Sequence, residues 1–375
     1  MRGRSDRVFA DRRRRRNKKQ ILIPLICAGA FLVAGVIIYL CVFGFAPAAE
    51  NFYPLDVTSE SQVAANTENV YYLSGTTLNC ADKKGAKRWS IKFTSGAVNL
   101  SVSDTLACVY SSDFATVLSS EGEHMYTLPT SDYKTKSVKC GIGYTAFLSE
   151  TEETQYIRVF NLEGSEIYRT EYPEEDILDY GFYGSNDSLF TLTLDTSGIS
   201  PVSRVTTMSP ATQSLTGTVD VTDQLIGDVK FVDTNMILCG TSTLSIYDNF
   251  GAQSDSTSIY GLSCSDSAIT KNGYIYAFLP KDISNLTNSC TVRIIGQSGG
   301  TDIDTNIQLP PGVKGAYVSS NKLYCILENS IYIYKLSGEF EKTLEAPDTI
   351  TAVTKLGEDK LKVACKEEVY LLIMD

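Results

Sequence analysis

Acidic side chains crowd one short segment of the chain and have the composition needed for acid–base chemistry. Paired carboxyl groups can act as general acid and general base, and glycoside hydrolysis uses such a pair. Spacing along the chain alone cannot make two of these groups face each other, so we expect the segment to be a charged loop. The five residues are Glu171, Glu174, Glu175, Asp176 and Asp179.

Asp302–Asn306 and His124 each have a residue type found in functional sites, but neither matches a known site pattern. Asp302–Asn306 opens like a calcium-binding loop, but its sixth position is Ile307 instead of glycine and its twelfth is Val313 instead of glutamate. A solvated loop between strands is expected there. His124 is the only histidine, which excludes sites built from two or three histidines. No G-x-S-x-G motif accompanies it, so we expect His124 to be an exposed strand residue.

Charge is distributed unevenly along the chain. It carries 33 Lys and Arg against 44 Asp and Glu, yet residues 1–19 contain ten basic and only two acidic residues. The remaining residues therefore carry a net charge of −19. A body this acidic lacks the basic face that neutralises phosphates, so nucleic acid is excluded as a partner.

Residues 21–45 form an uncharged apolar run that closely follows five consecutive arginines, Arg12–Arg16. A helix of about 20 apolar residues crosses a bilayer. The run predicts a transmembrane helix, and the positive-inside rule places the N-terminus in the cytoplasm and the later residues outside it. A cleaved signal peptide is the alternative, because Ala46-Pro47-Ala48 has the form of a cleavage site. Its apolar region would, however, be shorter, at about 7–15 residues.

The elements that must position any site are short strands, because the rest of the chain is rich in Tyr, Val, Ile and Thr between turn residues. One unit recurs: an apolar strand, then Asp, Asn or Ser, then glycine, then another strand. Its copies lie about 42 residues apart, the length of a propeller blade. The sequence predicts an all-β propeller with eight blades, or seven because the first copy is weak. The hairpin glycines are Gly85, Gly122, Gly164, Gly251, Gly299 and Gly338, and a copy from Val205 has none.

A second pattern, x-apolar-x-small, recurs on the strand before each unit. Its small residues are Cys108, Ala146, Thr191, Cys239, Ala277, Cys325 and Cys365. We expect them to occupy one position in successive blades, so the cysteines among them pack as small buried side chains. Cys140 and Cys264 are expected to pack on inner strands, which leaves Cys80 and Cys290 as the candidates for disulfide bonds. No C-x-x-C motif is present, so a thiolate zinc site is poorly supported.

The two ends of the repeat region complement each other. The last copy, from Ile350, supplies three strands, and Phe52–Val57 can supply the fourth and close the ring. Closure of this kind removes exposed sheet edges. The predicted organisation is a basic cytoplasmic tail at 1–20, a transmembrane helix at 21–45, a linker at 46–68 that holds the ring-closing strand at 52–57, and an extracytoplasmic propeller at 69–375.

The segment Leu78–Trp89, LNCADKKGAKRW, resembles the repeat of quinoprotein-type propellers, in which a strand, an Asp, a turn glycine and a Trp follow in order. The whole layout is similar to an uncharacterised bacterial family of single-span membrane proteins with a quinoprotein-like β-propeller outer domain, a domain of unknown function. This resemblance implies a fold and a location, but no activity. A more distant resemblance, to the propeller lipoprotein scaffold of outer-membrane assembly, implies protein binding.

These observations predict a membrane-anchored, extracytoplasmic β-propeller that acts as a binding or scaffold module for protein partners at the cell envelope. Loops on rigid scaffolds are where recognition usually resides. No catalytic, cofactor-binding or metal-ligating residue is assigned, and no cofactor is expected. The alternative is an extracytoplasmic, glycan-acting enzyme that uses paired carboxylates about 5–9.5 Å apart. A carboxyl pair in the central channel would favour the enzyme, and an apolar patch on one face would favour the partner module.

Overall fold

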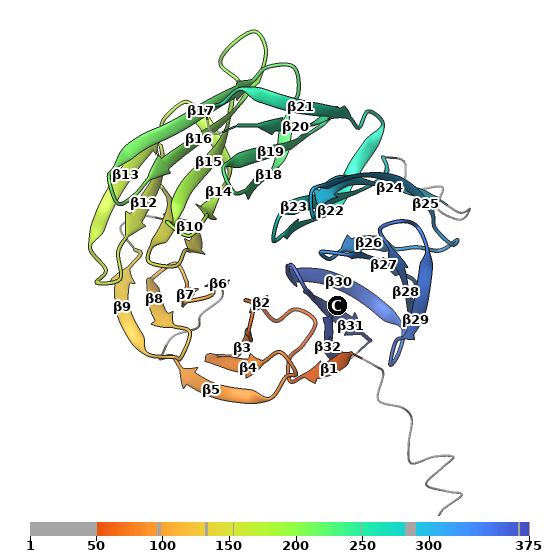
Figure 1. Ribbon diagram of the computed structural model, residues 1–375. Helices are drawn as coiled ribbons and strands as arrows, with labels where there is room; N and C mark the ends of the chain where they lie inside the picture. The colour runs from red at the N-terminus through yellow and green to blue at the C-terminus, as the bar shows by residue number, and fades with distance from the viewer. Residues whose placement is uncertain are drawn as a thin grey trace, which may run out of the picture. The chain divides into compact units, whose positions relative to one another are not determined.

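The computed structural model describes residues 51–374 except residues 95, 97, 98, 132, 133, 153, 249, 282–289 and 367. The strands of this part of the chain form eight four-stranded antiparallel sheets, each a blade of one ring (Figure 1). The predicted all-β propeller is therefore confirmed, with eight blades rather than seven.

Blades 1 to 4 follow one another along the chain, and each contains four consecutive strands. Blade 1 is β2 (Val63–Ala65), β3 (Asn69–Ser74), β4 (Thr77–Asp82) and β5 (Lys87–Lys92). Blade 2 is β6 (Asn99–Val102), β7 (Leu106–Tyr110), β8 (Phe114–Ser119) and β9 (His124–Pro129). Blade 3 is β10 (Lys134–Cys140), β11 (Thr145–Glu150), β12 (Gln155–Phe160) and β13 (Glu166–Tyr172). Blade 4 is β14 (Glu175–Tyr183), β15 (Ser188–Asp195), β16 (Val202–Ser209) and β17 (Ser214–Val221).

Blades 5 to 7 repeat this arrangement, and blade 8 completes the ring. Blade 5 is β18 (Ile226–Val232), β19 (Asn235–Gly240), β20 (Thr243–Tyr247) and β21 (Gln253–Ser258). Blade 6 is β22 (Leu262–Thr270), β23 (Gly273–Pro280), β24 (Thr291–Ser298) and β25 (Thr301–Gln308). Blade 7 is β26 (Gly315–Val318), β27 (Lys322–Ile326), β28 (Ser330–Lys335) and β29 (Phe340–Glu345). Blade 8 is β30 (Ile350–Gly357), β31 (Lys360–Cys365), β32 (Glu368–Ile373) and β1 (Phe52–Leu55).

Blade 8 takes its outermost strand from the other end of the described chain. β1 pairs antiparallel with β32, with Phe52 opposite Leu372 and Leu55 opposite Val369. Figure 1 shows the red-orange β1 beside the dark-blue β32. The ring-closing strand expected at 52–57 thus lies at 52–55. Because β1 pairs with the free edge of β32, blade 8 gains a fourth strand like the other blades, and both ends of the described chain are held in one sheet.

Burial explains why the middle strands lack alternation. β7 is buried at all five residues, because it has neighbouring blades against both faces. The outer strand β5, with the sequence KRWSIK, instead alternates between exposed and partly buried side chains. Continuous apolar runs and half-polar runs therefore mark inner and outer positions within one blade.

The turn between the third and fourth strands carries the hairpin glycine. All six expected glycines have positive φ, between +59° and +92°, a region that costs glycine little. In blade 1 the Gly85 amide donates to the Asp82 carbonyl at 2.9 Å, and the Asp82 carboxylate accepts the amides of Lys84 and Ala86. In blade 4, which has no such glycine, Gln213 adopts φ +54°. The recurring polar residue and glycine are thus explained by the turn.

The structure corrects three expectations about local structure. Residues 63–65, assigned to the linker at 46–68, form the inner strand of blade 1, so the propeller begins before residue 69. The acidic segment 171–179 is not a loop, because it covers the end of β13 and most of β14. Residues 302–306 lie inside the outer strand β25 rather than in a loop, because they pair with β24 along its length.

The expected column of small residues is not in register between blades. Leu106 and Lys322 hold equivalent positions, because they pair with Ser119 and Lys335, the residues that begin the hairpins of blades 2 and 7. Cys108 lies two residues after Leu106, whereas Cys325 lies three residues after Lys322. The two side chains therefore point to opposite faces of their sheets, since strand residues alternate.

Among the described residues, no helix has the length and apolar character needed to cross a membrane. The transmembrane helix expected at 21–45 and the basic tail at 1–20 lie outside those residues.

Candidate functional site

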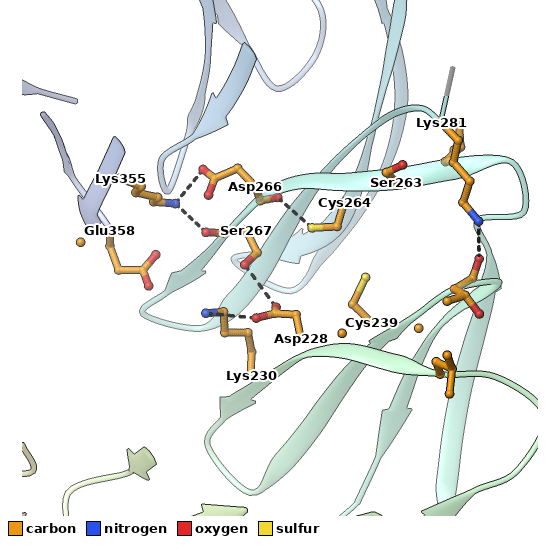
Figure 2. A pocket seen from close by; sticks show the side chains of 16 residues that line it. Asp228, Lys230, Cys239, Ser263, Cys264, Asp266, Ser267, Lys281, Lys355 and Glu358 are labelled. Atoms are coloured by element: carbon orange, nitrogen blue, oxygen red, sulfur yellow. Dashed lines mark hydrogen bonds and ion pairs between the residues drawn. The ribbon is translucent and has the colours of Figure 1, made fainter. Parts of the chain in front are cut away.

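The inner strands of blades 5, 6 and 8 surround a pocket of about 670 Å³, called here the channel pocket. Its charged and polar wall, seen in Figure 2, is formed by side chains from β18, β22, β30 and the turn after β30. These side chains are Asp228, Lys230, Asp266, Ser267, Lys355 and Glu358.

Lys355 of β30 is held by three acceptors. Its ammonium nitrogen lies 2.8 Å from Oδ2 of Asp266 and donates to the carbonyl oxygens of Ser267 at 2.5 Å and Val318 at 3.0 Å. An ammonium group has three protons, so all three are used. The same Asp266 oxygen accepts the Val318 amide at 2.8 Å. This one pair therefore ties blades 6, 7 and 8 together.

Asp228 of β18 joins blade 5 to blade 6. Its Oδ2 accepts hydrogen bonds from the Tyr276 hydroxyl at 2.8 Å and the Ser267 hydroxyl at 3.3 Å. Its Oδ1 lies 3.5 Å from the Lys230 ammonium group. Tyr276 is fully buried, and burial raises the pKa of its hydroxyl well above the ordinary value. It therefore acts as a neutral donor that fixes the Asp228 carboxylate.

Glu358 follows β30 and reaches back to blade 6. Its Oε2 accepts the Ile269 amide at 2.9 Å. Burial is the main cause that raises the pKa of Glu358, and the neighbouring Asp266 charge acts in the same direction. Burial also raises the pKa of Asp266, although Lys355 opposes it. Burial alone would lower the pKa of Lys230, but the Asp228 and Glu358 charges outweigh it and the pKa is raised.

The opposite wall of the channel pocket is less polar. It includes Leu225, Leu262 and the two thiols of Cys239 and Cys264, with Lys281 at the connection after β23. The Cys264 thiol donates to the Asp266 carbonyl at 3.6 Å, and the interaction with the neighbouring Cys239 thiol is the main cause that raises its pKa. Figure 2 shows both sulfur atoms on the same side of the pocket. A raised pKa leaves Cys264 as a weakly nucleophilic thiol.

This arrangement is compatible with two roles, general acid catalysis and the linking of neighbouring blades. Carboxyl groups with a raised pKa are suited to donate protons, as a general acid must. Each of the three carboxyl groups, however, accepts a hydrogen bond from a different blade. Among the described residues, no group of three or more His, Cys, Asp or Glu could hold a metal ion. The pocket's clearest role is therefore to hold blades 5 to 8 in place.

In the acidic segment 171–179, Glu175 and Asp179 contact basic or hydroxyl groups rather than each other. Glu175 lies 2.5 Å from Arg204 and accepts a hydrogen bond from Thr193. Asp179 lies 3.7 Å from Lys139. These groups are balanced by basic and hydroxyl partners on the strands around them.

The other residues singled out from the sequence are dispersed. Asp304 forms a two-point ion pair with Arg293, at 2.7 and 2.8 Å, and a hydrogen bond from that guanidinium is the main cause that lowers the pKa of Asp304. His124 is exposed and lies 2.9 Å from the Thr127 hydroxyl. Trp89 packs edge-on against Tyr71, with ring centroids 5.9 Å apart.

All eight cysteines in the described part of the chain are free. Cys80 and Cys290, the candidates for disulfide bonds, are therefore unbonded, and they belong to blades 1 and 6. Cys264, expected to pack, is exposed instead, because β22 presents it to the channel pocket. The expected burial is confirmed for the four cysteines of the x-apolar-x-small pattern, Cys108, Cys239, Cys325 and Cys365.

Sequence reasoning did not single out Asp228, Asp266 or Lys355. Asp266 and Lys355 are 89 positions apart, so no local motif joins them. The one available signal was the charged residue in the middle of an inner strand, as in LSCSDSAIT and ITAVTKLG. A charge in such a strand needs a partner, but the sequence does not say which one.

A ring of eight four-stranded blades defines the class of eight-bladed β-propellers. Within that class, the chain belongs to the Family of unknown function (DUF5711), whose sequence pattern matches residues 50–370. No curated protein sequence matches the chain.

Solved propeller structures are similar to the chain over most of its length. The WD40 domain of SCAP from fission yeast is 11% identical, with a TM-score of 0.57, over 86% of this chain and 98% of that one. BamB from Moraxella catarrhalis is 10% identical, with a TM-score of 0.54, over 86% and 96%. The computationally designed Ika8 protein is 13% identical, with a TM-score of 0.54, over 86% and 99%. At these identities the likeness shows the fold alone.

Proposed function

We propose that this protein is a membrane-anchored scaffold whose propeller lies outside the cytoplasm and binds protein partners at the cell envelope. The apolar run at 21–45 and the arginines at 12–16 support the anchor and its orientation. The net charge of −19 beyond the tail keeps the propeller soluble and favours partners with basic surfaces.

The observation that carries the proposal is that the charged side chains lining the channel pocket bond across neighbouring blades. Asp228, Asp266 and Glu358 each accept a hydrogen bond from another blade, and Lys355 donates to three oxygens of blades 6 and 7. Groups held in this way make the ring rigid. A rigid ring presents its connecting loops in fixed positions, which is what a recognition surface requires. Propellers commonly serve as protein-interaction scaffolds.

Crosslinking in the native membrane tests the proposal. The full-length tagged protein is crosslinked in intact cells, purified, and its co-purifying proteins are identified. The matched control carries residues 1–50 fused to an unrelated soluble domain. We expect at least one protein to be crosslinked to the full chain and not to the control. Equal recovery of every protein with both chains would contradict a scaffold role for the propeller.

A second candidate function is favoured by one observation, the raised pKa of both Asp266 and Glu358 in one pocket. These groups could serve an extracytoplasmic glycan-acting enzyme. Purified protein is incubated with cell-wall glycan fragments and chitin oligosaccharides, and released sugars are measured by mass spectrometry. Turnover that Glu358→Gln abolishes and the exposed control Glu345→Gln preserves would establish the enzyme. The scaffold proposal expects no turnover by any of the three proteins.

A further inference from the structure

One position in the blades determines how successive blades pack. In blades 1 to 4 the pairing of the third and fourth strands shifts by one residue near the hairpin. Just before the shift, counted along the third strand, one residue of that strand pairs with an outer-strand residue. In blades 1 to 3 this outer-strand residue is aromatic: Trp89, Tyr126 and Tyr168. In blade 4 the equivalent residue is Gly217. In blades 5 and 7 it is charged, Asp255 and Lys342.

The first two of these aromatic side chains cover the hairpin glycine of the next blade. A β-carbon on Gly122 would lie 3.0 Å from Cδ2 of Trp89, and one on Gly164 would lie 2.8 Å from Cγ of Tyr126. The Trp89 indole also donates to the Ser120 carbonyl at 3.2 Å. At these junctions the aromatic ring fills the space between two blades.

At the junction of blades 4 and 5 that ring is missing. Gly217 has no side chain, and the atoms that a β-carbon on Gly251 would meet are Thr218 O at 3.3 Å and a Val219 methyl at 3.4 Å. A cleft of about 410 Å³ lies there, called here the Gly217 cleft. This volume is within the roughly 300–1,000 Å³ typical of ligand sites. Its lining includes Tyr183, Thr207, Gly217, Phe231, Asp233 and Gly251.

The wall of the Gly217 cleft is aromatic and its charge is negative. The rings of Tyr183 and Phe231 are stacked, with centroids 3.7 Å apart and 11° between their planes. Asp233 and Asp248 line the cleft, and no Lys or Arg is among its described lining residues. Such a site attracts an apolar ring accompanied by positive charge.

An exposed apolar side chain lies next to the cleft in the chain. Phe250 precedes the lining residue Gly251 and is 88% exposed. Exposed large apolar side chains beside a pocket are typical of interaction sites. Together with the scaffold function proposed above, an exposed apolar side chain beside the cleft favours a polypeptide as the ligand.

We propose that the Gly217 cleft binds an aromatic side chain from a basic segment of a partner protein. The inference rests on the proposed scaffold function and names the chemistry of its partner. The aromatic ring packs against Tyr183 and Phe231, and the basic neighbours face Asp233 and Asp248. Buried aromatic side chains are common anchors of protein interfaces.

A peptide selection with the full-length protein tests this assignment. A displayed library of random nonapeptides is selected on the wild-type chain in detergent and depleted on Gly217→Trp, which fills the cleft from within. We expect a consensus with Trp or Tyr beside Lys or Arg. One selected peptide, fluorescently labelled, should bind Gly217→Trp at least tenfold more weakly than wild type by anisotropy. Phe340→Ser, on the exposed surface of blade 7, should leave its affinity unchanged.

Several results would overturn the assignment. These are a selection without peptides that prefer wild type, a consensus without an aromatic residue, and equal binding to Gly217→Trp. N-acetyltryptophanamide binding as tightly as the peptide would show a small-molecule site instead. If Gly217→Trp does not fold, Phe250→Ser must weaken peptide binding. A crosslinked partner that still binds Gly217→Trp would remove the cleft from the interface while the scaffold proposal stands.

Discussion

The ammonium group of Lys355 in blade 8 lies 2.8 Å from the carboxylate of Asp266 in blade 6. The inner strand of blade 7 between them, β26, is only four residues long. Lys355 therefore bonds to blade 6 and to the last residue of β26 at once. Both side chains are largely buried, with 17% and 11% of their surface exposed. The pair is a direct link between blades that are not consecutive.

Removing Lys355 should destabilise the ring. Lys355→Met leaves the Asp266 carboxylate buried without its counter-charge, and we expect the free energy of unfolding to fall by about 3 kcal/mol. Chemical denaturation followed by circular dichroism measures this. The double variant Lys355→Met/Asp266→Leu should recover part of the loss, because it leaves no buried charge unpaired. A matched control, Lys366→Met, removes an exposed pair and should change the midpoint little. Equal effects of the two single variants would contradict the link.

Hairpin glycines that face an aromatic ring should tolerate a β-carbon least. Gly122→Ala combines φ +86° with a contact 3.0 Å from the Trp89 ring, so we expect a loss of about 2 kcal/mol. Gly75→Ala has φ +59° but open space around the new carbon, so its cost should be nearer about 1 kcal/mol. Thermal unfolding of both variants provides the comparison. The reverse order would show that packing on Trp89 does not constrain this turn.

Ring closure by β1 predicts a sharp boundary for truncation. A chain that begins at residue 51 keeps Phe52–Leu55 paired with β32, and its thermal midpoint should equal that of the full chain. A chain that begins at residue 58 leaves the edge of β32 open and uncovers apolar residues of blade 8. We expect its midpoint to fall by at least several degrees, since about 1 kcal/mol corresponds to roughly 2–4 °C at this size. Similar midpoints for the two chains would argue against closure.

The channel carboxyl groups should make stability depend on pH. The raised pKa of Asp266 and Glu358 means that their contribution is fully present below about pH 4, where the unfolded groups are also protonated. It is lost as pH rises through the raised pKa values, because the folded state then gives up the extra protons. Glu358→Gln should therefore make the decline in unfolding free energy between pH 4 and 8 shallower.

Asp304 supplies a control of opposite sign for this pH dependence. Its pKa is lowered, chiefly by the hydrogen bond from Arg293, so its contribution is present above the unfolded pKa and is lost as pH falls. Asp304→Asn should reduce stability at neutral pH and leave it unchanged in acid. Identical pH profiles for wild type and Glu358→Gln would show that the channel glutamate does not titrate in this range.

The blades could be predicted because their signals are local. Each hairpin repeats a polar residue and a glycine within a few positions, and the positive φ of Gly85 or Gly164 restricts the residue type there. The ring-closing strand could also be predicted, since the last copy lacks a fourth strand. The column of small residues could not, because the position of the small residue within its strand differs between blades and a shift of one residue reverses the face.

The two candidate sites depend on relations that the sequence does not display. Lys355 and Asp266 belong to blades 8 and 6 and meet across β26 only in the folded ring. Gly217 can be recognised as the equivalent of Trp89 only when the register shift in each blade is known. The sequence shows that the copy from Val205 lacks the glycine turn, but the missing aromatic residue is recognised only when the strands of each blade are paired.

Every proposed partner requires the propeller to lie outside the cytoplasm, and labelling of single introduced cysteines tests this location most directly. Ser200→Cys lies in an exposed connection of blade 4, and Ser5→Cys lies in the basic tail. Both are treated in intact cells with a membrane-impermeant maleimide, with the unmodified chain as background. We predict labelling of Ser200→Cys above background and labelling of Ser5→Cys only after the membrane is permeabilised. The reverse pattern, or protection of both until permeabilisation, would contradict an extracytoplasmic scaffold.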